Sequence, residues 1–192
     1  MNSALERAKR VKAAVFDGDG VVFTGHVFEG MEGGFGKVRS HADGQGISLL
    51  RAIGFPVACV TGEGGKSAVF LVKLAEKWNS LPSVREGRWH PVTVFEGAEK
   101  EKKVEIVTSW LAEKNLTLQE CAAMGDDLTD YHLLKAVGGA GGLAAAPAQA
   151  EEAIKKLALF TASRRGGDGA IRDLANFILE AKGIDATTLS LR

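Results

Sequence analysis

Hydrophobic positions along the chain fall into short unbroken runs that alternate with longer segments in which apolar residues recur at helical spacing. The short runs predict buried strands at residues 11–16, 55–60, 92–95, 121–125 and 142–146, with a last strand possible at 159–161. The helical segments cover residues 46–54, 66–78, 102–115, 127–137, 150–158 and 169–183. Strands that alternate with helices along a whole chain predict an α/β fold, a Rossmann-like parallel sheet with helices on both faces.

Two segments interrupt this alternation. Residues 20–40 alternate apolar and polar positions around a glycine-rich centre, which predicts a β-hairpin that projects from the sheet. Residues 80–90 are polar and irregular, which predicts a surface insertion. No internal repeat or long linker divides the chain, so we expect a single domain over residues 1–192.

Composition and charge narrow the function classes. Of the 192 residues, 45% are hydrophobic, and 24 basic side chains balance 24 acidic ones, so the charge favours neither a nucleic acid nor a membrane surface as partner. We find no secretion signal in the first ten residues and no apolar run near the ~20 residues of a membrane span. Cys59 and Cys121 lie in apolar runs and are expected to be free buried thiols, which fits a cytoplasmic protein.

Polar residues follow four of the predicted strands, and they carry the candidate chemistry. These stretches are "DGDG" (17–20), "TGE" (61–63), "EKEKK" (99–103) and "GDDLTD" (125–130). Ligands of parallel sheets bind where the strands end, so the two acidic clusters are expected to converge there. Carboxylate oxygens suit Mg²⁺, whereas the alternative is that each cluster is a solvated turn or a helix cap. A cation, a carboxylate nucleophile and hydroxyl and ammonium donors together suit phosphoryl transfer.

Four short motifs along the chain resemble, in order, the four motifs of the haloacid dehalogenase superfamily. They are "VFDGDGV", "VTGE", a lysine before a helix and "MGDDLTD". "HADGQGI" (41–47) and "SRRGGDGAIRDL" (163–174) resemble one branch of it, so that the likeness covers roughly residues 12–182. That branch contains phosphatases of 3-deoxy-octulosonate 8-phosphate and 2-keto-3-deoxy-nononate 9-phosphate, and the related C-terminal modules of sialic acid cytidylyltransferases. The resemblance implies the haloacid dehalogenase fold, and the spacing of the motifs leaves no room for a separate cap domain.

The resemblance assigns roles to the five aspartates. Asp17 would be the nucleophile that forms an aspartyl-phosphate, and Asp19 would protonate the leaving sugar oxygen and then activate the hydrolytic water. Mg²⁺ would bind the Asp17 carboxylate, the Asp19 backbone carbonyl and Asp126. Asp127 and Asp130 would orient the metal's waters or its loop.

Further residues would hold the phosphate. Thr61 would bind the phosphoryl oxygens, and Gly20 and Gly62 would lie against the substrate, Gly20 because it lets the backbone approach the phosphate closely. Lys100, Lys102 and Lys103 are all candidates for the motif lysine, and the apolar phase of the helix that follows favours Lys103.

The sequence departs from the octulosonate phosphatases at two positions. Those enzymes usually carry arginine where this chain has Ala42 and Glu63, which resembles the nononate phosphatases instead. Glu63 could accept hydrogen bonds from sugar hydroxyls or be a solvated residue at a helix start. Arg164, Arg165 or Lys66 could hold the substrate carboxylate, or each could belong to a solvated basic turn.

Two functions remain after these assignments. The first is a Mg²⁺-dependent phosphatase of a keto-deoxy sugar acid phosphate, with the nononate 9-phosphate favoured and the octulosonate 8-phosphate next, in the biosynthesis of a sialic acid or lipopolysaccharide precursor. The second is a non-catalytic tetramerisation or regulatory module. The presence of Asp17, Asp19, Lys103 and Asp126 favours the enzyme. In this branch the resemblance also implies a homotetramer in which the hairpin of one subunit covers a neighbour's site.

Overall fold

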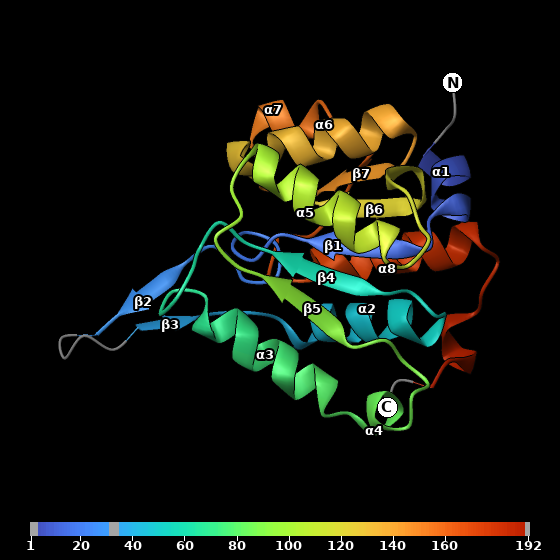
Figure 1. Ribbon diagram of the computed structural model, residues 1–192, viewed down its shortest axis with the longest axis horizontal. Coiled ribbons are helices and arrows are strands. Elements are labelled where there is room, and N and C mark those ends of the chain that lie inside the picture. Colours follow the sequence, from blue (N-terminus) through green and yellow to red (C-terminus); the bar gives the residue numbers. More distant parts are fainter. Residues whose placement is uncertain (1–3, 31–34, 191–192) are drawn as a thin grey trace.

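The computed structural model describes residues 4–30 and 35–190, and its centre is a six-stranded sheet in the order β5-β4-β1-β6-β7-β8 (Figure 1). All five neighbouring pairs in this sheet are parallel. The strands are β1 (Ala13–Phe16), β4 (Val57–Val60), β5 (Val92–Phe95), β6 (Cys121–Met124), β7 (Leu143–Ala146) and β8 (Phe160–Thr161). The predicted parallel α/β sheet is therefore confirmed, including its short last strand.

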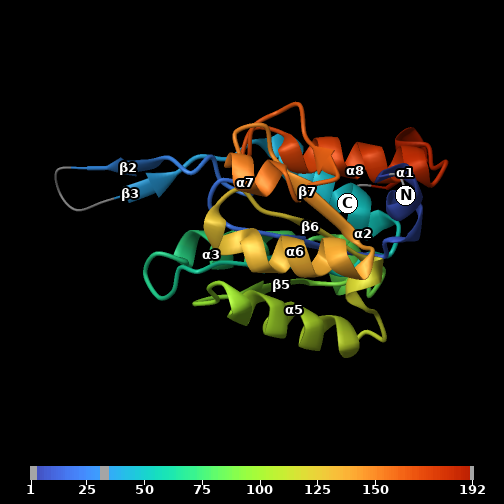
Figure 2. The same cartoon turned by 90° about the horizontal axis from the view of Figure 1, so that it is seen from above.

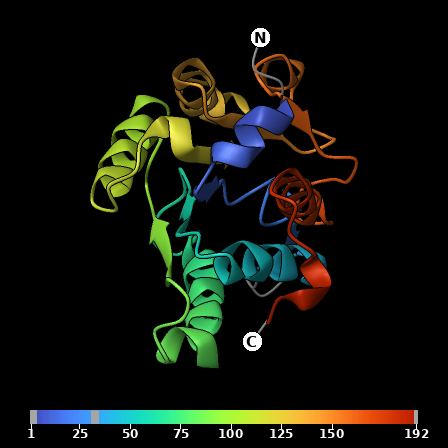
Figure 3. The same cartoon turned by 90° about the vertical axis from the view of Figure 1, so that its right-hand side faces the viewer.

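Helices cover both faces of the sheet (Figures 2 and 3). On one side lie α1 (Ala4–Arg10), α2 (His41–Ala52), α3 (Val69–Asn79) and α8 (Ala170–Ala181). On the other side lie α5 (Glu101–Ala112), α6 (Tyr131–Ala140) and α7 (Glu152–Lys155). None of the helices in the described part of the chain is long and apolar enough to cross a membrane.

The alternation of side chains along β1 builds both halves of the core. Ala14 and Phe16 pack into the cluster under α2 and α8, whereas Ala13 and Val15 pack into the cluster under α5 and α6. Successive side chains of a strand point to opposite faces, so a strand buried on both sides must be apolar at every position. This is why "AAVF" reads as an unbroken apolar run.

Several predicted elements differ in extent. The helix expected at 46–54 begins earlier, at His41, where the side chain of Ser40 caps its first turn. The prediction missed this turn because it carries no apolar pattern. Helix α1 was not expected, and it is held by hydrogen bonds from Arg7 to the carbonyls of Gly138 and Gly142. The helix expected at 150–158 is shorter, and the expected surface insertion at 80–90 contains a short helix, α4 (Pro82–Arg85), and a buried Trp89.

The predicted hairpin at 20–40 is present but begins later. Its strands are β2 (Val27–Glu29) and β3 (Phe35–Lys37), which pair antiparallel and project from the body (Figures 1 and 2). Residues 31–34 of the prediction lie outside the described residues. Residues 21–23 are buried in the core instead, where the N–H groups of Val22 and Phe23 donate to the carbonyls of Asp17 and Gly18.

Candidate active site

The candidate site lies where β1, β4 and β6 end. A cavity of about 460 Å³ opens there, and 11 residues line it: Asp17, Asp19, Gly20, Gly25, Thr61, Gly62, Glu63, Glu99, Asp126, Asp127 and Thr129. Strand β1 lies between β4 and β6, so the segments that follow these three strands emerge side by side. Residues from all four expected stretches therefore meet in one place, since Glu99 of the stretch 99–103 also lines the cavity.

Lys103 joins two of the aspartates. It lies in the first turn of α5, its side chain is 1% exposed, and its Nζ lies 2.5 Å from Asp17 Oδ1 and 2.6 Å from Asp130 Oδ1. Burial alone would lower the pKa of Lys103, but the two carboxylates outweigh it and raise the pKa, so the ammonium stays charged. Of the three candidate lysines, Lys103 is the one that enters the site, whereas Lys102 donates to the carbonyl of Gly97.

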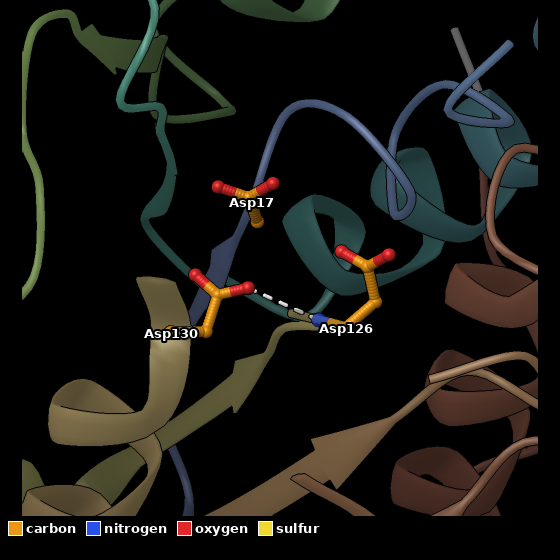
Figure 4. Close-up of side chains that lie close together, drawn as sticks. All are labelled: Asp17, Asp126 and Asp130. Carbon is orange, nitrogen blue, oxygen red and sulfur yellow. Dashed lines mark hydrogen bonds between the residues drawn. The ribbon is translucent and has the colours of Figure 1, made fainter. Parts of the chain in front are cut away.

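Asp130 holds the loop that carries Asp126. Its Oδ2 accepts a hydrogen bond from the backbone N–H of Asp126 at 3.0 Å (Figure 4). Its Oδ1 accepts from Lys103. Both oxygens of Asp130 are therefore engaged. Asp127 is exposed and accepts a hydrogen bond from the backbone N–H of Leu128, which caps the turn that follows.

Negative charge exceeds positive charge at this point. One carboxylate oxygen from each of Asp17, Asp126 and Asp130 lies within 4.8 Å of the other two (Figure 4). The Lys103 ammonium contacts both Asp17 and Asp130. Burial raises the pKa of Asp17 well above its usual range, and the charge of Asp130 raises it further. Burial raises the pKa of Asp126 to about 7, with added contributions from Asp130 and Asp127. Hard oxygen ligands with an unbalanced charge are the surroundings that a Mg²⁺ ion prefers.

The backbone at Gly20 comes unusually close to Asp126. Gly20 has a φ of +78°, which favours glycine, and a Cβ there would collide with the Asp126 carboxylate. Gln149 fixes this loop because its Nε2 donates to the Gly20 carbonyl at 2.7 Å, while its Oε1 accepts from the N–H of Gly166 at 2.8 Å. Gln149 was not predicted, and a single amide in a loop gives no sequence signal.

The end of β4 supplies the hydroxyl. Thr61 is buried, and its Oγ1 accepts a hydrogen bond from the backbone N–H of Glu63 at 3.1 Å. Thr61, Gly62 and Glu63 all line the cavity, as the sequence predicted for this stretch.

Lys37 is the charged residue that sequence reasoning missed. It comes from β3, and its Nζ lies 2.7 Å from Asp19 Oδ2 and 2.8 Å from Glu63 Oε2. The Asp19 carboxylate thus contacts the hairpin through its Oδ2. A lone lysine in a polar ribbon carries no motif, so only the fold could reveal it.

Two predicted substrate contacts lie outside the cavity. Lys66 is exposed in the loop before α3 and lines none of the hollows described here. Arg165 lines a separate hollow at the base of the hairpin together with His26, Arg39 and Asp168. The structure therefore does not bring Lys66 or Arg165 to the aspartates.

Comparison with known proteins places this geometry in a family. Residues 68–172, more than half of the chain, match the haloacid dehalogenase-like hydrolases. The chain is 28% identical over 181 residues to the 3-deoxy-D-manno-octulosonate 8-phosphate phosphatase KdsC of Yersinia pestis, covering 94% of this chain and 86% of that one. The structure resembles that of a probable YrbI family phosphatase from Pseudomonas syringae (31% identity, TM-score 0.77, 94% and 91% covered). It also resembles the crystal structure of 3-deoxy-D-manno-octulosonate 8-phosphate phosphatase from Yersinia pestis (25% identity, TM-score 0.80, 97% and 90% covered).

Proposed function

The chain belongs to the haloacid dehalogenase-like hydrolases, and we propose that it is a Mg²⁺-dependent phosphatase of a keto-deoxy sugar acid phosphate. One observation carries the proposal. Asp17, at the end of the central strand, shares a cavity with Asp126 and touches the buried ammonium of Lys103. A carboxylate nucleophile beside a fixed cation and a cluster of oxygen ligands suits attack on a phosphate monoester.

In the first half of the reaction, an oxygen of Asp17 attacks phosphorus and the bond between phosphorus and the sugar oxygen breaks. Asp19 gives its carboxyl proton to that sugar oxygen, so the sugar leaves as an alcohol. Lys103 and Thr61 bind phosphoryl oxygens and stabilise the charge that they carry in the transition state.

In the second half, Asp19 is a carboxylate and takes a proton from the water that attacks the aspartyl-phosphate. The bond between Asp17 and phosphorus breaks, which releases inorganic phosphate and restores both carboxyl groups. One residue serves both steps because the proton that it loses in the first is returned in the second.

The oxygens of Asp17 and Asp126 and the backbone carbonyl of Asp19 would hold Mg²⁺, while Asp127 and Asp130 orient the loop around it. The raised pKa values of Asp17 and Asp126 support this assignment, because they show that the protein places too little positive charge near these carboxylates to offset their burial. When bound, the ion would neutralise the phosphoryl group. A further proposal is that Gly20 and Gly62 let the substrate approach the backbone.

The choice of sugar rests on two positions. Glu63 and Ala42 replace the arginines usual in octulosonate phosphatases, so our first candidate is the nine-carbon nononate 9-phosphate. The second candidate is the eight-carbon octulosonate 8-phosphate, which the name of the Yersinia pestis relative favours. The ratio of kcat/KM for the two sugar phosphates on the same preparation decides between them.

We further propose a homotetramer built through the hairpin and a cytoplasmic location. On β2, Val27 is 49% exposed and Phe28 is 62% exposed, and apolar side chains on a two-stranded ribbon favour burial against another chain. The two cysteines are buried free thiols, as a reducing compartment allows. Sedimentation should give a tetramer for the wild type and a smaller species for Phe28→Asp, with Leu159→Asp, another exposed apolar residue, as the control.

A turnover screen tests the enzyme against the alternative of a non-catalytic module. The purified protein is offered sugar phosphates and 4-nitrophenyl phosphate, with Mg²⁺ and with a chelator. We expect phosphate release with Mg²⁺ and its loss with the chelator. No release from any phosphate monoester in the presence of Mg²⁺ would favour the tetramerisation module instead.

A further inference from the structure

Lys37 lies between the cavity at the strand ends and a second hollow beside the hairpin. The second hollow has a volume of about 420 Å³ and is lined by Val27, Glu29, Gly30, Phe35, Lys37, Glu63 and Ser67. Glu63 lines both hollows. A substrate whose phosphate sits against Asp17 has room to extend its sugar past Glu63 into this second hollow.

The hairpin is docked so that Lys37 reaches the site. The ring of Phe35 packs edge-on against the ring of Phe70, with centroids 5.1 Å apart, and the backbone N–H of Thr24 donates to the carbonyl of Val38 at 2.9 Å. Residues 35 and 37 of a strand share a face, so the contact that seats Phe35 also directs Lys37 toward Asp19. The Lys37 side chain is 4% exposed, although it comes from the projecting hairpin.

We propose that Lys37 is a positioning residue for Asp19, which fixes the carboxyl group that protonates the leaving sugar oxygen. This inference rests on the proposed phosphatase function. The ammonium of lysine has only donors, so Asp19 Oδ2, which accepts from Lys37 at 2.7 Å, cannot also carry the proton toward that nitrogen. The proton of Asp19 is therefore placed on Oδ1, the oxygen that Lys37 leaves free.

Glu63 keeps Lys37 in this place. The ammonium of Lys37 lies 2.8 Å from Glu63 Oε2. Lys37 therefore binds both Asp19, the proposed general acid, and Glu63, which lines the second hollow. Burial alone would lower the pKa of Lys37, but the hydrogen bonds that Lys37 donates to the carboxylates of Asp19 and Glu63 outweigh it, so the pKa is raised and the residue remains a cation. The hairpin thereby connects the sugar side of the cavity to the group that releases the sugar.

The test uses the leaving group of the substrate. The value of kcat/KM reports the steps up to departure of the leaving group, and a sugar alcohol needs a proton at that step whereas 4-nitrophenolate does not. We expect Lys37→Met to lower kcat/KM for the sugar phosphate and for glycerol 2-phosphate by about 10- to 100-fold, a part of the usual effect of general acid catalysis. The same variant should lower kcat/KM for 4-nitrophenyl phosphate less than about threefold. Lys73→Met, an exposed lysine on α3, is the matched control.

A double-mutant cycle with Asp19→Asn separates positioning from sugar binding. If Lys37 acts through Asp19, Lys37→Met has no further effect on kcat/KM in the Asp19→Asn background. With Asp19 intact, Lys37→Arg should keep part of the activity on alkyl phosphates that Lys37→Met loses. Equal losses on all three substrates, or a loss that persists in the Asp19→Asn background, would overturn the inference. If the wild type itself hydrolyses none of them, the proposed function fails, which is a different result.

Discussion

The cavity at the strand ends and the projecting hairpin follow opposite physical rules. In the cavity, Asp17, Lys103 and Asp130 are joined by short contacts, expose 11% or less of their side chains, and are fixed on or next to elements of the sheet and its helices. On the hairpin, β2 is a three-residue strand whose apolar side chains face solvent. Rigid elements suit a reacting group that must be held within a fraction of an ångström, whereas projecting segments suit recognition, which varies between relatives. Lys37 is the point where the second region reaches the first.

The sharpest way to test the cavity's side of this comparison is to remove the nucleophile. Asp17→Asn is nearly isosteric, so the fold should survive while kcat falls by about 1,000-fold or more, because the amide cannot form the acyl phosphate. The measurement is phosphate release from the best substrate of the screen, with circular dichroism to verify folding. Glu105→Gln, an exposed carboxylate on α5, should keep wild-type activity. Wild-type turnover by Asp17→Asn would mean that the mechanism is wrong.

The next test removes the buried cation of the same cluster. Lys103→Met leaves Asp17 and Asp130 side by side without their shared ammonium, and breaking a buried ion pair costs about 3–5 kcal/mol of unfolding free energy. Urea denaturation measures the loss. The exposed neighbour Lys102→Met should change stability by less than about 0.5 kcal/mol. Similar losses of unfolding free energy for the two variants would show that the buried ion pairs of Lys103 stabilise the fold no more than an exposed lysine does.

The hairpin's side of the comparison is tested through selectivity. Glu63→Arg replaces the partner of Lys37 with a like charge and introduces the residue that the resemblance assigns to octulosonate phosphatases. We expect the ratio of kcat/KM for the nine-carbon over the eight-carbon sugar phosphate to fall by about 10- to 100-fold, or about 1–3 kcal/mol. Hydrolysis of an aryl phosphate should change little. An unchanged ratio would show that Glu63 does not select the sugar.

The difference between the regions also explains what the sequence could predict. The strands at 13–16 and 121–124 are apolar at every position because helices cover both of their faces, so their ends, and the aspartates that follow, could be placed from the pattern alone. The choice of Lys103 was possible because the apolar phase of α5 fixes its register.

The contacts of the hairpin could not be predicted in this way. Its alternating pattern indicates a ribbon but not the direction in which the ribbon leans, and that direction is set by Phe35 against Phe70, residues 35 positions apart. The contacts of Lys37 with Asp19 and of Gln149 with Gly20 likewise join residues far apart in the sequence. Local periodicity holds no information on them.

The smallest expected effect is the change in stability with pH that the Asp126 carboxylate causes when no metal is bound. The pKa of Asp126 is raised to about 7 by burial and by Asp130 and Asp127, against about 4 for an unfolded chain. The folded protein therefore binds more protons than the unfolded chain between these values, so the stability of the metal-free protein falls as pH rises from about 4 to about 7. Above pH 7 the loss is complete and constant.

Asp126→Asn cannot ionise, so it should escape this loss. With a chelator present at pH 8, we expect the variant to be more stable than the wild type by about 1–2 kcal/mol, a value reduced because Asp126 is only partly buried. The gain should vanish near pH 4, and Asp168→Asn, an exposed aspartate, should show none at either pH. Adding Mg²⁺ at pH 8 should stabilise the wild type more than the variant, because an ion that binds the folded state supplies the missing positive charge. A variant that is less stable than the wild type at pH 8 would mean that Asp126 is compensated by the protein alone, and that the cavity needs no cation to balance its charge.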